Sequence, residues 1–102
     1  MRYNVLHFFE RKNIDIANIL YLTRQNPDTK ITFFDGKEIL TAIPVKEIAI
    51  YLPEEEFVNI TKGILLRKSQ IVNISDDGLY TMTDGSVFQG RKRNISQHKQ
   101  LR

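Results

Sequence analysis

The sequence predicts a mostly β domain with a minor helical part, on three observations. Short β-branched and aromatic runs alternate with turn signals about every 8 to 12 residues, a spacing typical of antiparallel strands. Asp-Gly occurs at residues 35–36, 77–78 and 84–85, and Asp-Gly between apolar runs is a strong hairpin signal. One segment, 44–52, departs from this rhythm and has helical spacing. Strands spaced in this way favour a sandwich or a barrel.

The expected strands are the β-branched and aromatic runs between these turns. In chain order they are Tyr3–Phe9, Ile19–Thr23, Thr29–Phe34, Lys37–Ile43, Phe57–Ile60, Gln70–Ser75, Leu79–Met82 and Val87–Gln89. Asn26-Pro27-Asp28 ends the second of these runs with residues that favour turns. The three Asp-Gly pairs each separate two consecutive runs, so we expect antiparallel hairpins there.

Residues 44–52 are predicted to form a two-turn amphipathic helix. Its apolar positions follow the i, i+3, i+4, i+7 pattern of one helical face: Val45, Ile48, Ala49 and Leu52. Pro44 is tolerated at a first helical position, and Pro53 ends the segment. The tail, 94–102, allows either a second short helix or a frayed end.

Length and composition limit the class of protein. A chain of 102 residues is expected to form a single domain, 1–102. Its 41% apolar and 26% charged content is that of a soluble globular protein. Cysteine is absent, which excludes disulfides, thiolate zinc sites and cysteine nucleophiles. No apolar run approaches the roughly 20 residues that cross a bilayer, and the N-terminus lacks a signal-peptide pattern. We therefore expect a cytoplasmic protein.

The titratable residues do not suggest an enzyme. His7 and His98 are the two histidines, and they share no metal-ligand spacing. The acidic run Glu54–Glu56 is interpreted as a solvated turn, and Asp76, Asp77 and Asp84 as turn residues. There is no acid and base pair, no nucleophile triad and no glycine-rich phosphate loop. The sequence predicts a protein without catalysis, cofactor, metal or small-molecule substrate.

Positive charge is concentrated in the second half of the chain. Residues 57–102 hold eight Lys or Arg against three acids, a formal charge of +5, whereas residues 1–56 carry −2. No acidic side chain follows Asp84, and Arg91-Lys92-Arg93 comes soon after it. A one-sided basic region suits a polyanion, because each Lys or Arg that meets a phosphate releases condensed counterions.

Two short basic segments are the strongest binding candidates. Thr61-Lys62-Gly63 and Arg91–Asn94 each come directly after a predicted strand. Arg suits guanine, Asn suits adenine, and Thr or Lys suits either a base or a phosphate. With the other cations of this half, the candidate DNA-binding residues are Thr61, Lys62, Arg67, Lys68, Arg91, Lys92, Arg93 and Asn94. Charge alone leaves a solvated charge run equally open, and the aromatic signature of RNA-binding sheets is missing.

The order of segments resembles the LytTR family of bacterial DNA-binding domains. The matching pieces, covering about residues 14–101, are 15–22 (the family's "D-I-x-Y-I" strand), 33–38 (its first hairpin), 45–52 with Pro53 and Phe57 (its helix and exit), 57–67 ("F-x-R-I-H-R-S-Y-L-V-N") and 84–93 ("D-G-x-x-x-x-S-R-R"). Residues 1–13 precede this match, and their strand is expected to pair within the domain.

The resemblance implies an elongated, mostly β arrangement of small antiparallel sheets with one or two short helices. In that family, loops rather than a recognition helix enter the major groove of double-stranded DNA. It further implies a sequence-specific bacterial transcription regulator, here in a stand-alone form without a receiver domain. Its expected partners are double-stranded DNA, a second copy of the chain on repeated half-sites, and a sensor or membrane-protein regulator.

Several positions depart from the family pattern. Thr61 stands where the family has a base-contacting His, Gly63 and Gly90 replace Ser, Ile64 replaces Tyr, and Arg67 replaces Asn; Lys62 and Arg91 match in charge. These departures remove neutral hydrogen-bonding groups and keep cationic ones. A second function therefore stays open: a LytTR-like protein-interaction module with weak or non-specific DNA binding.

Overall fold

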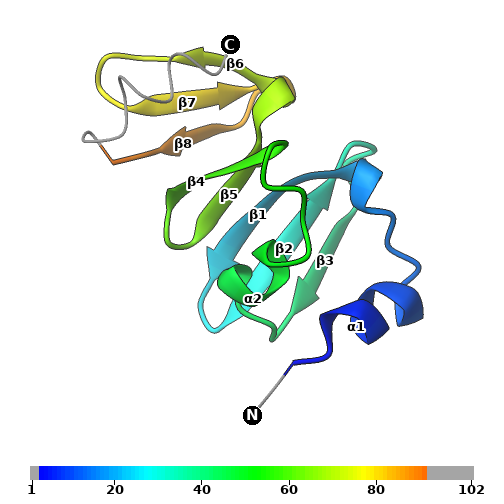
Figure 1. Cartoon of the computed structure of the whole chain (residues 1–102). Helices are drawn as coiled ribbons and strands as arrows, with labels where there is room; N and C mark the ends of the chain where they lie inside the picture. Colours follow the sequence, from blue (N-terminus) through cyan, green and yellow to red (C-terminus); the bar gives the residue numbers. More distant parts are fainter. Residues whose placement is uncertain (1–2, 92–102) are drawn as a thin grey trace.

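Two antiparallel sheets make up the framework in the computed structural model, which describes residues 3–91 (Figure 1). The larger sheet has the strand order β3-β2-β1-β5-β4 and the smaller one β6-β7-β8. The strands are β1 (Ile19–Gln25), β2 (Asp28–Phe33), β3 (Glu38–Thr41), β4 (Phe57–Thr61), β5 (Ile64–Arg67), β6 (Ile71–Ile74), β7 (Leu79–Met82) and β8 (Val87–Gln89). The helices are α1 (Val5–Arg11) and α2 (Val45–Ala49), with 3-10 turns η1 (Ile16–Asn18) and η2 (Lys68–Gln70). The principal extents of 40, 28 and 23 Å show an elongated shape, and the predominance of strands confirms the mostly β class.

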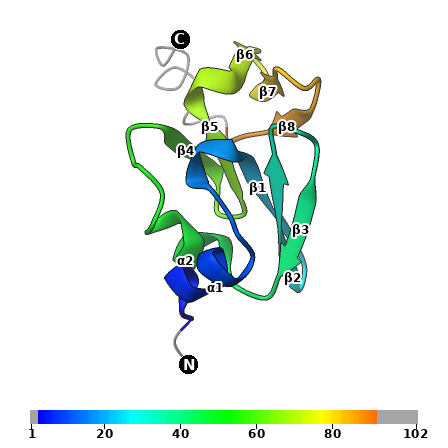
Figure 2. The same ribbon diagram turned by 90° about the vertical axis from the view of Figure 1, so that its right-hand side faces the viewer.

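The larger sheet carries a buried core on each of its faces. Helices α1 and α2 cover one face over a core that includes Ile19, Leu22 and Leu65 (Figure 2). The smaller sheet packs against the other face over a second core that includes Leu20, Tyr21 and Leu66. A β-bulge between Ile19 and Tyr21 turns two consecutive side chains, Leu20 and Tyr21, to the same side. This packing gives two separate cores, and neither sheet closes into a barrel.

The three Asp-Gly turns share one hairpin geometry. In each, the glycine N–H bonds to the carbonyl three residues earlier: Gly36 to Phe33, Gly78 to Ser75 and Gly85 to Met82. The glycines have φ of +88°, +86° and +90°. This is a type I turn followed by a left-handed residue, for which glycine has no steric penalty. The predicted hairpins are confirmed.

The first predicted strand, Tyr3–Phe9, is wrong, because this segment forms helix α1. The side chain of Asn4 caps it by accepting a 3.0 Å hydrogen bond from the His7 N–H. Val5, Phe8 and Phe9 lie at helical spacing and are buried in the first core. A short apolar run fits a strand or a buried helix equally well, and here the cap favours the helix.

Helix α2 is shorter than predicted, although its apolar face is confirmed. Pro44 lies at the N-cap rather than at the first helical position, and the helix ends at Ala49. The next N–H groups bond three residues back, Tyr51 to Ile48 and Leu52 to Ala49, so the chain tightens into 3-10 geometry. No helix in residues 3–91 is long and apolar enough to cross a membrane.

Strand β5 was not among the strands expected from sequence runs, yet it lies between β1 and β4. A two-residue loop, Lys62-Gly63, separates it from β4. The other predicted strands, from Ile19–Thr23 onward, are confirmed, and no observed strand end differs from the predicted one by more than two residues. Through β5, the end of β1 comes to lie beside the β4–β5 hairpin, which positions the site described next.

Candidate nucleic-acid interface

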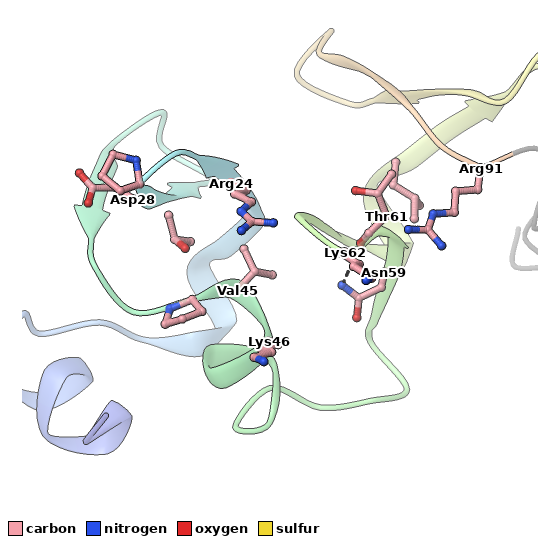
Figure 3. Close-up of a pocket in the computed structure, with 12 residues that line it drawn as sticks. Arg24, Asp28, Val45, Lys46, Asn59, Thr61, Lys62 and Arg91 are labelled. Carbon is pink, nitrogen blue, oxygen red and sulfur yellow. Dashed lines mark hydrogen bonds between the residues drawn. The ribbon is translucent and has the colours of Figure 1, made fainter. Parts of the chain in front are cut away.

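Lys62 and Arg91 line one hollow, although 29 positions separate them in the sequence. The hollow has a volume of about 630 Å³. Its walls are formed by Arg24, Pro27, Asp28, Thr29, Pro44, Val45, Lys46, Asn59, Ile60, Thr61, Lys62 and Arg91. We call it the basic groove, because four cations and one acid, Asp28, line it. Arg24 and Lys46 lie on one side, and Asn59, Thr61, Lys62 and Arg91 on the other (Figure 3).

The β4–β5 hairpin presents Lys62 at its tip. The Gly63 N–H donates to the Thr61 hydroxyl over 3.2 Å, which closes the loop. The Asn59 side-chain amide donates to the Thr61 carbonyl over 3.4 Å. An irregularity in pairing between Asn59 and Thr61 bends the strand, and Ile60 at this point is fully buried in the second core. Lys62 is therefore an exposed side chain on an anchored loop.

Arg91 is positioned by the glycine before it. The Gly90 N–H donates a 2.7 Å hydrogen bond to the Gly78 carbonyl. A Cβ atom on Gly90 would lie 2.4 Å from Cε1 of Tyr80, whose side chain is fully buried. Gln89 adds side-chain hydrogen bonds of 3.0 Å to the carbonyls of Asp77 and Gly90. The end of β8 is thus held against β7, which fixes the position of the backbone from which the Arg91 side chain extends.

Arg24 and Lys46 were missed by sequence reasoning because they belong to the half with a negative net charge. Arg24 lies near the end of β1 and donates its backbone N–H to the Gly63 carbonyl over 2.7 Å. Lys46 lies on α2 and is exposed. The antiparallel pairing of β1 with β5 brings Arg24 to the hairpin. Recognition of β5 as a strand is the signal that would have found it.

Arg67, a predicted DNA contact, is buried and does not line the basic groove. Its side chain is buried, at 6% exposure. Its Nε and Nη2 donate 2.7 Å hydrogen bonds to the carbonyls of Ile19 and Ile16, and Nη1 pairs with Glu56 at 3.1 Å. The guanidinium also lies 4.5 Å from the Phe57 ring centroid. These contacts use the guanidinium inside the fold, so Arg67 stabilises the larger sheet.

The other predicted contacts divide between two places. Lys68 is half-buried on η2, at the opposite end of β5 from Lys62, and does not line the basic groove. Lys92, Arg93 and Asn94 lie outside the described residues.

Of the acidic run, Glu56 is more than a solvated turn residue, because it pairs with Arg67. Within residues 3–91 no cluster of His, Asp and Glu is arranged to hold a metal.

A hydrogen-bond network fixes the smaller sheet to the larger one. The Tyr21 hydroxyl donates to Asp84 over 2.8 Å and lies 2.9 Å from the Ser86 hydroxyl. The Tyr21 ring makes an edge contact with Phe88 at 4.9 Å between centroids. Burial is the main cause that raises the pKa of Tyr21; Ser86 opposes it and Asp84 adds to it.

Asp84 responds in the opposite direction. Partial burial acts to raise its pKa, but hydrogen bonds from the Ser86 N–H, the Tyr21 hydroxyl and the Ser86 hydroxyl together lower it. A carboxylate that accepts several hydrogen bonds is favoured in its charged form. Asp84 thus acts both as a turn residue and as a link between the sheets.

Comparison with known proteins identifies the fold. No protein-family model matches the chain, and no curated protein matches its sequence. Among solved structures, it is similar to the LytTr DNA-binding domain of a protein described as a methyl-accepting/DNA response regulator from Bacillus cereus. The TM-score is 0.72, at 17% identity, over 84% of this chain and 82% of that one. The chain has a LytTR fold. The fold that the segment order implied is therefore confirmed.

Proposed function

We propose that this chain binds double-stranded DNA through the basic groove and acts without catalysis, as a transcription regulator. The observation that carries the proposal is the convergence of Arg24, Lys46, Lys62 and Arg91 on one hollow of a LytTR fold. The ion pairs within residues 3–91 are Lys30–Glu38 and Arg67–Glu56, so none of the four is neutralised by a carboxylate there. Exposed, unpaired cations on one surface attract the phosphates of a duplex.

The solved neighbour supports this proposal, because its name describes a DNA-binding domain. On this chain, Thr61, Lys62 and Arg91 are the proposed contacts within the described residues. Lys92, Arg93 and Asn94, which directly follow Arg91 in the sequence and lie outside the described residues, complete the proposed set. Sequence-specific reading by these side chains, and pairing of two copies on repeated half-sites, are parts of the same proposal.

Three departures from the family pattern have a structural explanation. Gly63 and Gly90 replace serines, yet a Cβ atom on either would meet Arg24 or Tyr80 within 3.0 Å. Arg67 likewise replaces Asn in order to fill a buried position. These replacements follow from packing, so they do not by themselves favour the alternative function, a protein-interaction module with weak DNA binding.

The proposal is tested by selecting bound duplexes from a random pool and then titrating the protein with the enriched sequences. We expect the full chain to enrich a sequence pattern and to bind it with salt-dependent affinity. Binding of all duplexes alike would reduce the proposal to a non-specific DNA-binding protein. No binding at low salt would refute it, and a stoichiometric protein partner recovered in that case would favour the interaction module.

A further inference from the structure

We propose that Arg24 is a DNA-contacting residue that takes the place of the side chain that Gly63 lacks. The inference rests on the proposed function and deepens it, since it adds a contact from the half of the chain with negative net charge. The contact lies where β1 pairs with the β4–β5 hairpin and the two backbones approach closely.

The stem of Arg24 lies directly over Gly63. A Cβ atom on Gly63 would lie 2.7 Å from Cβ, 3.1 Å from Cδ and 3.5 Å from Cγ of Arg24. A contact below 3.0 Å cannot be accommodated without a shift, and Cβ is fixed to the backbone of β1. Residue 63 can therefore carry no side chain while Arg24 follows its present course. At this place the hairpin residue, Gly63, has no side chain, and the side chain of Arg24 from β1 occupies the space instead.

The backbone beneath this contact is rigid. Thr23 pairs with Ile64, and the Arg24 N–H extends the ladder to the Gly63 carbonyl at 2.7 Å. Arg24 therefore moves with the hairpin that carries Lys62. A side chain whose backbone is already held by strand pairing needs no ordering of that backbone when it binds, which favours affinity.

The guanidinium of Arg24 is also available for a ligand. The side chain is exposed and lines the basic groove on the side opposite Lys62 (Figure 3). Asp28 is the acid that lines the groove, yet it forms no ion pair with Arg24 within 4.0 Å. Two cations that line one groove, neither of them paired with a carboxylate within residues 3–91, favour the binding of an anion in that groove. Arginine suits this position because its planar fork can bind a phosphate or a guanine edge through two hydrogen bonds.

The test compares R24Q and R24K with the control K37Q, each measured on the duplex selected by the wild-type chain. Lys37 is an exposed lysine in the β2–β3 turn, beside the Ile19 end of β1 and away from the groove. We expect R24Q to lose affinity by at least about fivefold, the lower bound for loss of a bidentate contact. K37Q, with the same change in charge, should bind like the wild type.

The lysine variant and the salt dependence identify the atoms that Arg24 contacts. Rescue by R24K, with a salt slope restored by about 0.9, indicates a phosphate. Failure of R24K, with the loss confined to the selected sequence, indicates a guanine edge. Wild-type affinity of R24Q, while K62A and R91A lose binding, would refute the role of Arg24 and leave the proposed function intact. Absence of DNA binding by the wild type would refute both.

Discussion

The hydroxyl of Tyr21 on β1 donates a 2.8 Å hydrogen bond to the carboxylate of Asp84, 63 residues away in the β7–β8 turn. This bond joins the larger sheet to the smaller one at the face where the second core lies. Arg91 follows β8 of the smaller sheet, and Lys62 follows β4 of the larger one. The orientation of one sheet against the other therefore sets the distance between these two proposed DNA contacts. The network therefore connects fold stability to the geometry of the basic groove.

We expect Y21F to lower the free energy of unfolding by about 1 kcal/mol, a typical value for a hydrogen bond that is partly exposed to solvent. The ring and its contact with Phe88 remain, so the loss reports the hydroxyl alone. Urea unfolding measures it. Y51F is the matched control, since the Tyr51 side chain is 41% exposed and forms no part of the network. Equal stability of Y21F and Y51F would show that the hydroxyl contributes nothing.

The lowered pKa of Asp84 predicts a loss of stability in acid. Its ordinary value is 3.8, and its folded value is lower. The unfolded chain therefore binds a proton more readily, so the contribution of Asp84 is present above that ordinary value and is lost as pH falls through the folded pKa. The difference in unfolding free energy between wild type and D84N should shrink as the pH falls below about 4. A difference independent of pH between 6 and 2 would contradict the assignment.

Arg67 should affect stability rather than DNA binding. R67A removes a buried guanidinium that donates to the carbonyls of Ile19 and Ile16 and pairs with the half-exposed Glu56, so we expect a loss of about 3 kcal/mol. R67K should recover only part of this, because lysine cannot reproduce the fork that reaches both Ile19 and Ile16. DNA affinity of the folded R67K variant should equal that of the wild type. A variant with normal stability and weakened DNA binding would return Arg67 to the contact set.

Gly90 should tolerate no side chain. A Cβ atom would lie 2.4 Å from the ring of Tyr80, which is fully buried and cannot move away freely. We expect G90A to cost about 1 to 3 kcal/mol, as is usual for overpacking. G36A is a useful comparison, because Gly36 faces open space and its φ of +88° imposes backbone strain alone. A G90A variant as stable as the wild type would show that β7 and β8 separate easily.

The sequence predicts local structure better than it predicts the site. Turn chemistry identifies the hairpins at Gly36, Gly78 and Gly85, because only glycine adopts their φ without penalty. The helix α1 was missed because Val5, Phe8 and Phe9 satisfy both a strand and a helix until the Asn4 cap is seen. Arg24 was missed for a different reason. Its place beside Gly63 depends on strand pairing across 39 positions, and charge counted along the chain cannot show such a juxtaposition.

Salt titration of the basic groove should separate contact residues from nearby cations. Lys62 and Arg91 are exposed, line the groove, and are not paired with a carboxylate in residues 3–91. If each meets one phosphate, K62A and R91A should each reduce the slope of log affinity against log salt by about 0.9. The double variant should lose about twice that, because independent contacts add.

Lys68 supplies the matched comparison for this series. It belongs to the same basic half but lies at the far end of β5, outside the groove. K68A should therefore leave the slope unchanged, although it removes the same net charge as K62A. Equal effects of K62A and K68A would mean that the chain attracts DNA through its total charge, and the groove would then have no special part in binding.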